Sequence, residues 1–460
     1  MAENNFIVAI ELGSSKIRGI AGIKSGDGSV KVAAYAQADS TSFMRKGTIS
    51  NIVKATAAIR DLKSQLEDNI KKPISKVYVG MCGLYTHSEI RTVGRNFMEQ
   101  TQISAEQINH VVAENAGQIQ PDTEILEVIT QEYRIDKTYQ FDPVGALANQ
   151  LEGNFLNIVT RSSSCEYIRK CFKDADLQIA DLIVSYKATA TTALSPMEMN
   201  SGCALVDLGA ETTTVSIFKK GILRHLCVIP LGSTTITRDL FTLQIEDEAE
   251  ILKFKYGTAL VSESDNETGL LKGSIKLGNG LSVEIGLIAQ YVAARMEEIL
   301  SNVWNQIQNT GYDREIIAGI ILTGGGSNLE KIVECMKKLC PEAINVRVAN
   351  TLRSGAKIGG IHPAAAKDGA HQTILGLLLL GEEECCSKES FFEASKAATV
   401  VKPIAEETLT KKAEEEEDVE EAEMTKEEKH KEPAVPKGPS SFSKWKDKFG
   451  SWLDKNMGQD

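Results

Sequence analysis

Residues 10–16 read Ile-Glu-Leu-Gly-Ser-Ser-Lys, and this short stretch decides the fold. An apolar run over residues 6–12 leads into the glycine, and a second apolar run begins at Ile17. The pattern predicts a strand, a tight turn and a second strand. A glycine and two small hydroxyl residues let backbone N–H groups and hydroxyl oxygens approach phosphate oxygens, and the lysine adds positive charge. The turn is therefore either a phosphate-binding loop or a plain hairpin.

The same pattern returns 196 residues later. Residues 205–213 read Leu-Val-Asp-Leu-Gly-Ala-Glu-Thr-Thr, with Asp207 in the place of Glu11. A unit that recurs once at this distance predicts a body of two similar halves. With the two turns facing each other, the two carboxylates can hold the waters around a phosphate-bound Mg²⁺. The alternative for Asp207 is a turn residue that bonds its own backbone.

A third glycine-containing stretch lies at residues 320–328, which read Ile-Ile-Leu-Thr-Gly-Gly-Gly-Ser-Asn. The pattern predicts a buried strand that runs into three glycines and then a helix. Backbone without Cβ atoms offers a flat surface to a nucleobase or phosphate, and a helix N-terminus favours negative charge. A Rossmann unit is the alternative, but the spacing is not G-x-G-x-x-G and the stretch lies near the end of the body. A fourth feature is Glu250 with Lys253, which share a helical face either as a ligand contact or as an exposed salt bridge.

The order of these features resembles the phosphate-one, phosphate-two and adenosine motifs of the actin-like ATPase superfamily. The resemblance implies an α/β, two-lobed actin-like fold of duplicated ribonuclease-H-like halves, with ATP and Mg²⁺ between them. In relatives a Glu–Lys pair contacts the ribose hydroxyls. The cofactor-binding residues implied are Gly13, Ser14, Ser15, Lys16, Asp207, Gly209, Thr212, Glu250, Lys253, Gly324, Gly325, Gly326 and Ser327. The implied Mg²⁺ site, reached through water, consists of Glu11 and Asp207.

Further stretches make the chain resemble the FtsA family of bacterial cell-division proteins over nearly all of residues 6–380. They lie at residues 77–80, 131–136, 143–145 and 223–230. An α+β unit over residues 86–175 stands where that family carries its distinctive subdomain 1C. Chaperones, sugar kinases and rod-shape filaments of the superfamily lack this insertion. The helix of the unit is expected to begin with the capping pattern Ser-Ala-Glu-Gln at residues 104–107.

The resemblance also implies how the chain is divided. The implied divisions are a first lobe (subdomain 1A) at 1–85 and 176–205, subdomain 1C at 86–175, and a second lobe at 206–390 that contains subdomain 2A and, at about 235–311, subdomain 2B. Two residues depart from the family pattern. Glu11 stands where an aspartate is usual, which shifts the carboxylate relative to Mg²⁺. Glu211 stands where a glycine is usual, and a carboxylate beside the phosphates disfavours a tightly held triphosphate. Because no residue is a candidate catalytic base, we expect ATP binding with at most slow hydrolysis.

The composition changes after the body. Residues 401–430 hold five lysines and twelve acidic residues, and residues 391–440 are predicted to be a disordered linker. Residues 441–457 are predicted to form an amphipathic helix. Its apolar residues within about 100° of a helical wheel are Phe442, Trp445, Phe449, Trp452 and Leu453. Residues 442–457 hold four lysines and two aspartates, which suits an anionic membrane surface. The alternative is a helix that docks on a protein groove. In the FtsA family this segment is the membrane-targeting sequence.

Composition excludes other classes of protein. Outside the linker the chain is only mildly acidic, which argues against nucleic-acid binding. The nine cysteines show no metal-ligand spacing and are expected to be reduced thiols in the cytosol. No signal segment opens the chain, and the longest apolar stretch, around residues 377–380, is too short to span a bilayer. We therefore expect a cytosolic protein whose membrane contact is peripheral.

Together these features lead to one functional expectation. The resemblance implies an ATP-binding protein that tethers the FtsZ ring to the cytoplasmic face of the membrane at the division site. It also implies binding of the FtsZ C-terminal peptide by residues 243–311, head-to-tail self-assembly through residues 86–175, and recruitment of other division proteins. The alternatives are an ATP-binding pilus-assembly protein of the same fold, or a kinase, for which no substrate-side acid or base is found. A chaperone would need a substrate domain after residue 390.

Overall fold

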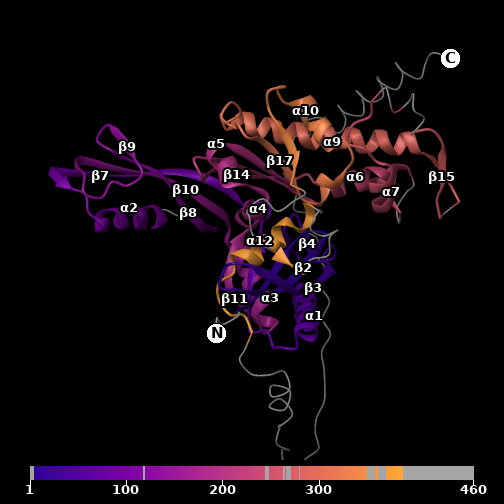
Figure 1. Cartoon of the computed structure of the whole chain (residues 1–460), viewed down its shortest axis with the longest axis horizontal. Helices are drawn as coiled ribbons and strands as arrows, with labels where there is room; N and C mark the ends of the chain where they lie inside the picture. The colour runs from indigo at the N-terminus through magenta and orange to yellow at the C-terminus, as the bar shows by residue number, and fades with distance from the viewer. Residues whose placement is uncertain are drawn as a thin grey trace, which may run out of the picture. The chain divides into compact units, whose positions relative to one another are not determined.

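The computed structural model describes residues 5–117, 120–243, 248–262, 265, 271–278, 280–349, 358–360 and 369–386 (Figure 1). All of them belong to one compact unit, residues 1–400. The predicted linker at 391–440 and the predicted membrane helix at 441–457 lie outside the described residues. Among the described residues, no helix is long and apolar enough to cross a membrane.

The first lobe is built on a six-stranded sheet with the order β11-β6-β1-β2-β3-β19. Its strands are β1 (Asn5–Leu12), β2 (Lys16–Lys24), β3 (Val30–Asp39), β6 (Lys76–Met81), β11 (Gln178–Val184) and β19 (Ile358–Gly359). Strands β1, β2 and β3 are antiparallel, whereas β6 and β11 run parallel to β1. A short hairpin, β4 (Met44–Arg45) and β5 (Thr48–Ile49), follows β3.

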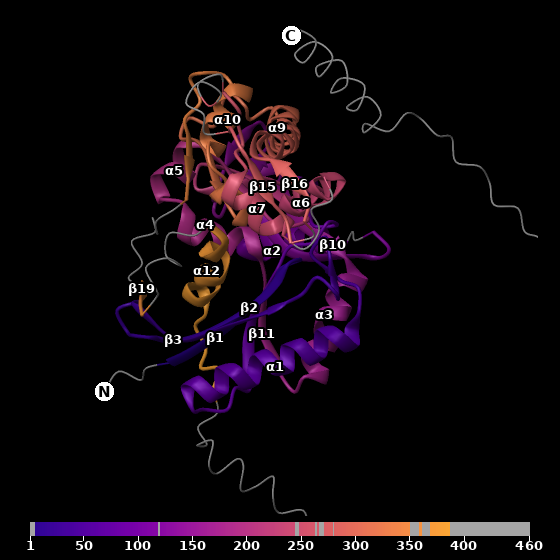
Figure 2. The same ribbon diagram turned by 90° about the vertical axis from the view of Figure 1, so that its right-hand side faces the viewer.

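Helices cover both faces of this sheet (Figure 2). Helices α1 (Ile52–Ile70) and α3 (Ser162–Asp174) lie on one face, and α12 (Gln372–Leu380) lies on the other beside α4 (Ser185–Ala193). A Cβ atom at Gly19 would meet Leu62 of α1, whereas one at Gly80 would meet Leu377 of α12. The predicted second lobe extended to residue 390, but α12 packs in the first lobe. Its fully buried leucines complete the first core after the chain has returned from the second lobe.

The second lobe repeats the first sheet. Its order is β14-β13-β12-β17-β18, formed by β12 (Cys203–Leu208), β13 (Thr213–Lys219), β14 (Ile222–Ile229), β17 (Gly319–Thr323) and β18 (Val346–Val348). The strand directions match those of β3-β2-β1-β6-β11. The two hairpin turns also match, because a Cβ atom at Gly13 would lie 2.6 Å from the Lys16 carbonyl oxygen and one at Gly209 would lie 2.7 Å from that of Thr212. The predicted duplication of the fold is confirmed.

Helices of the second lobe pack on its sheet and beside it. They are α5 (Pro196–Ser201), α6 (Ser233–Leu240), α7 (Ala249–Tyr256), α9 (Ile285–Asn309) and α10 (Ile332–Leu339), with the small hairpin β15 (Ser274–Lys276) and β16 (Ser282–Glu284) and the 3-10 turns η1 (Phe241–Leu243) and η2 (Gly325–Asn328). The apolar stripe of α9 is buried along the second core, from Ile288 to Ile307. This burial follows the helical spacing of its apolar residues.

The inserted unit is a separate four-stranded sheet covered by one helix. Its elements are β7 (His87–Gln102), α2 (Ala105–Gly117), β8 (Thr123–Ile135), β9 (Thr138–Gln140) and β10 (Leu147–Arg161), with the sheet order β7-β10-β8-β9. The Gln107 N–H donates to Ser104 Oγ (3.3 Å) and the Ser104 N–H donates to Gln107 Oε1 (2.8 Å), so the predicted cap of α2 is present. The unit is tied to β14 of the second lobe, since Gln131 Nε2 donates to the Leu223 carbonyl (3.0 Å).

Candidate functional site

A cavity of 790 Å³ lies between the two lobes, and all three predicted glycine turns line it. Its volume is within the range of small-molecule and cofactor sites. The lining residues that the sequence predicted are Glu11, Gly13, Ser14, Ser15, Lys16, Asp207, Gly209, Thr212, Glu250, Gly324 and Gly325. The cavity arises because β1 and β12 end at the same gap between the lobes, and each carries its turn there.

Glu11 and Asp207 form an acidic pair in this cavity. Burial raises the pKa of Asp207 to about 7, and the charge of Glu11 raises it further. Burial also raises the pKa of Glu11, although Arg18 opposes this with its guanidinium 3.3 Å from Glu11 Oε2. Two desolvated carboxylates with one arginine between them are under-neutralised. They fit a hydrated Mg²⁺, whose remaining ligands would be water and phosphate oxygens, because the described residues hold no cluster of three or more metal-ligating side chains.

Glu250 is positioned at the opposite end of the cavity from its own helix, α7. Glu250 Oε2 accepts hydrogen bonds from Thr237 Oγ1 (2.6 Å) and Lys253 Nζ (2.7 Å). The Glu250 side chain is 59% exposed, so its other carboxylate oxygen can accept from a ligand hydroxyl. Phe254, one helical turn further on, lines the cavity beside it and is 43% exposed.

Lys253 was predicted to bind the cofactor, but it does not line the cavity. Its side chain is 1% exposed, and Nζ also donates to the Ser233 carbonyl (3.2 Å) and to Thr237 Oγ1 (3.1 Å). Burial lowers the pKa of Lys253, and the charge of Glu250 opposes the shift. The ammonium therefore holds the carboxylate of Glu250 in place from below.

The third glycine turn differs from its prediction in one respect. No α-helix begins at the glycines, because residues 325–328 form the 3-10 turn η2 and α10 begins at Ile332. Gly326 and Ser327 are buried behind the turn, where Ser327 Oγ donates to the Gly324 carbonyl (2.7 Å). Gly324 and Gly325 are the two glycines that line the cavity.

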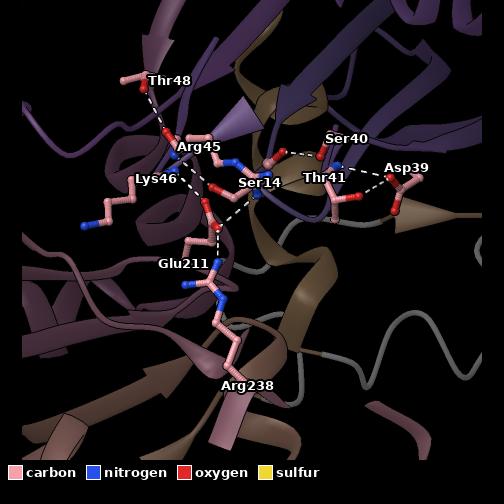
Figure 3. A network of polar contacts seen from close by, with 11 residues as sticks. Ser14, Asp39, Ser40, Thr41, Arg45, Lys46, Thr48, Glu211 and Arg238 are labelled. Atoms are coloured by element: carbon pink, nitrogen blue, oxygen red, sulfur yellow. Dashed lines mark hydrogen bonds and ion pairs between the residues drawn. The ribbon is translucent and has the colours of Figure 1, made fainter. Parts of the chain in front are cut away.

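Glu211 was expected to face the phosphates, and this expectation is wrong. Its carboxylate turns out of the cavity and bridges the lobes (Figure 3). Glu211 Oε2 accepts from the Lys46 N–H of the first lobe (2.6 Å), and Oε1 accepts from Arg238 Nη2 of α6 (3.0 Å). Arg45 Nη1 lies 3.6 Å from the same Oε1. The carboxylate is thus neutralised away from the place where a triphosphate would lie.

The β4–β5 hairpin is held by both phosphate-sized turns. The Gly47 N–H donates to Ser14 Oγ of the first turn (2.8 Å), one residue after Lys46 donates to Glu211 of the second. Contacts from one hairpin to both turns make the closure of the lobes depend on this short segment.

Replacing Glu211 by glutamine is expected to lower stability without increasing nucleotide affinity. The amide keeps one acceptor oxygen but loses the charge shared with Arg238 and Arg45, so we expect a cost of about 1–2 kcal/mol. Thermal unfolding of the full chain measures it, with the exposed Glu342→Gln as the matched control. Tighter ATP binding by Glu211→Gln would mean that the carboxylate does face the phosphates.

Several residues of the cavity were missed from the sequence. They are Arg18, Thr237, Phe254, and the pair Tyr35 and His371, whose Oη and Nε2 atoms are 3.2 Å apart. Arg18 carried a signal, because a tight hairpin at residues 13–16 places it directly opposite Glu11. His371 carried none, since it belongs to the 3-10 turn η3 (Gly369–His371), which reaches the cavity only through the return of the chain to the first lobe.

Comparisons with known proteins agree with this architecture. A family model described as "Cell division protein FtsA" matches residues 204–370, and one described as "SHS2 domain inserted in FTSA" matches residues 83–159. The chain is 31% identical over 352 residues to the cell division protein FtsA of Porphyromonas gingivalis, covering 75% of this chain and 73% of that protein. It is 28% identical to FtsA of Neisseria meningitidis, covering 73% and 82%.

Among solved structures, a PilM–PilN type IV pilus biogenesis complex is similar with a TM-score of 0.53 at 14% identity, covering 81% of this chain and 97% of that chain. At this identity the likeness concerns the fold alone. Duplicated lobes, a ligand-sized cavity between them and an inserted α+β unit define an actin-like protein. The inserted unit and the relatives specify the group further. The chain belongs to the FtsA family of cell-division proteins.

Proposed function

We propose that this FtsA-family protein binds ATP with Mg²⁺ between its lobes and tethers the FtsZ ring to the cytoplasmic face of the membrane. The observation that supports nucleotide binding is the 790 Å³ cavity, in which two matching hairpin turns and a glycine turn converge. Backbone N–H groups and hydroxyls at such turns bind phosphate oxygens. The inward-facing carboxylates and the outward-turned Glu211 suit a phosphate-bound cation.

In this proposal each part of the cavity has one task. The turns at residues 13–16 and 209–212 hold the phosphates, with the charge of Lys16 added. Glu11 and Asp207 orient water around Mg²⁺, which neutralises the phosphates. Glu250 accepts from the ribose hydroxyls, while Phe254 and the glycine turn offer flat surfaces to the base. Hydrolysis is at most slow, since no residue has the role of a catalytic base.

Glu250→Ala is expected to weaken ATP binding about 10-fold, because a hydrogen bond to a charged group contributes about 1.5–3 kcal/mol. Titration of a fluorescent ATP analogue in Mg²⁺ measures the affinity. Glu334→Ala, an exposed change on α10 of the same lobe, is the matched control. The ATP part of the proposal fails if the unaltered protein binds no ATP, or if both variants bind it equally.

The tethering part rests on the family and on the tail sequence. The basic, aromatic segment at residues 442–457 would fold on anionic lipid and anchor the body at the division site. Subdomain 2B, at residues 243–311, would receive the C-terminal peptide of FtsZ. Subdomain 1C would contact the next protomer head to tail, and the polymer would recruit later division proteins. A single short anchor, interrupted by Gly450, binds weakly, so polymerisation would strengthen attachment by multiplying anchors.

Replacing Trp445 and Trp452 by glutamate in the full chain is expected to reduce binding to anionic vesicles more than 10-fold. The change removes two aromatic anchors and places negative charge against the lipid. Co-sedimentation with vesicles measures it. Ile317→Glu, at a 74% exposed position of the second lobe, is the control. Unchanged sedimentation of the tryptophan variant would rule out the tail as the anchor.

A further inference from the structure

Strand β11 forms an open edge of the first sheet. It pairs with β6 on one side only, and the sheet ends there. Gln178 and Asp181 of this strand are exposed. An edge strand presents unpaired N–H and C=O groups that can accept a further strand. The outer strand of the second sheet, β14, differs in this respect because the inserted unit packs on it.

Two hollows lie along the edge of β11, on opposite faces of the sheet. A 460 Å³ hollow is lined by β11 together with Tyr78, Leu380 and Glu382, so it opens on the face that α12 covers. A 660 Å³ hollow is lined by β11 together with Arg169 and Lys173 of α3, so it opens on the other face. A strand laid beside β11 would have one hollow on each side.

The two hollows differ in chemistry. The charged residues of the α12-side hollow are Glu127, Asp181, Lys187, Glu382 and Glu383, which leaves it acidic. Glu127 pairs with Lys187 (2.8 Å) and Glu383 pairs with Lys76. Within the part of the chain that the structure describes, Asp181 and Glu382 have no such ion pair. In the α3-side hollow, Leu177, Ile179 and Leu182 give an apolar floor.

We propose that β11 is a docking edge for an extended cationic peptide of a partner protein. In a strand, successive side chains point to opposite faces. A peptide that alternates lysine or arginine with apolar residues would therefore put its cations beside Asp181 and Glu382 and its apolar side chains on the α3-side floor. Main-chain hydrogen bonds to β11 would supply affinity, and the two hollows would supply sequence selectivity.

The edge carries features that reject other strands. A β-bulge at Ala180 interrupts the pairing with β6, and Asp181 places a charge on the rim. Bulges and edge charges protect sheets from indiscriminate pairing. Here they also select, because only a segment that neutralises Asp181 gains by pairing at this edge.

Synthetic peptides test the proposal on the full chain. The probe is a fluorescent octapeptide of alternating lysine and valine, compared with its blocked isomer of four lysines followed by four valines. A third peptide keeps the alternating order but is N-methylated along its backbone. Both comparison peptides are expected to bind about 10-fold more weakly or worse, since they lose the alternation or the main-chain hydrogen bonds. Hydrogen exchange is expected to show protection of residues 178–182 by the alternating probe.

Charge reversal supplies the matched variant. Asp181→Lys combined with Glu382→Lys is expected to weaken the alternating probe about 10-fold. Glu342→Lys, an exposed change on the second lobe, is expected to leave binding unchanged. The proposal is overturned if no peptide binds at millimolar concentration, if the three peptides bind equally, or if protection appears at another edge such as β7. Normal thermal unfolding of the double variant confirms that lost binding reflects the edge, and these outcomes do not depend on ATP or lipid binding.

Discussion

Replacing Gly324 by alanine is expected to destabilise the protein by about 3 kcal/mol or more and to reduce ATP affinity more than 10-fold. Gly324 has a φ of +82°, which L side chains rarely adopt. A Cβ atom there would also lie 2.3 Å from Asp207 Oδ1 and 2.6 Å from the Leu208 carbonyl oxygen. Backbone strain and an overpacked contact each cost about 1–3 kcal/mol. The contact displaces the carboxylate that we assign to the hydrated Mg²⁺.

Gly28→Ala separates the two causes of this loss. Gly28 has a similar φ of +78°, but nothing lies within 4 Å of a Cβ atom placed there. It is expected to cost only about 1 kcal/mol and to leave ATP binding unchanged, because strain is its sole effect. Thermal unfolding and ATP titration of both variants measure the difference. Equal losses for the two variants would show that the contact between Gly324 and Asp207 has no importance.

The turns of the site could be predicted from the sequence because their signals are local. A glycine with small hydroxyl residues between two apolar runs specifies a hairpin, and the repeat of that pattern at Glu11 and Asp207 specifies the duplicated sheet. The match between the Gly13 and Gly209 turns shows how directly the sequence determines this part. The cap of α2 was equally local, since Ser104 and Gln107 are three residues apart.

Other features depend on contacts between distant segments and gave no local signal. The direction of Glu211 is set by Lys46 and Arg238, which lie on different lobes. The burial of Lys253 depends on how α7 packs beside α6 and α9, so a helical wheel shows its neighbour Glu250 but not its depth. Helix α12 returns to the first lobe because its leucines fill a core that the first lobe leaves open.

The geometry suggests how the cavity and the inserted unit are connected. The unit leaves the first lobe by its chain connections, yet it is bound to β14 of the second lobe through Gln131 and through Ser88, whose Oγ accepts from the Leu226 N–H (2.8 Å). A change in the angle between the lobes must therefore be taken up where the unit joins them. Because the β4–β5 hairpin links both phosphate-sized turns, phosphate contacts are placed to bias that angle.

Asp207→Asn is expected to weaken Mg²⁺-dependent ATP binding about 10- to 100-fold while stabilising the nucleotide-free protein at pH 8. The carboxylate holds the waters of the cation, so its loss removes an interaction with a charged group. In the absence of ligand, burial and the charge of Glu11 raise the pKa of Asp207 from 3.8 to about 7. A raised carboxyl pKa means that the folded state binds the proton more tightly than the unfolded state. The stability of the unaltered protein therefore falls as the pH rises from about 4 to about 7 and then levels off.

The asparagine variant lacks this titration, so its advantage should grow over the same pH window. We expect it to be about 1–3 kcal/mol more stable than the unaltered protein at pH 8, a gain that shrinks towards pH 5. Thermal unfolding at both pH values measures the gain, and ATP titration with Mg²⁺ or with a chelator measures the binding. Asp61→Asn, an exposed change on α1, is the control for the loss of one charge. Equal gains by both variants at pH 8 would show that burial beside Glu11 does not destabilise Asp207. Equal ATP affinity of the Asp207 variant with and without Mg²⁺, together with a clear Mg²⁺ dependence in the unaltered protein, would connect this carboxylate directly to the cation.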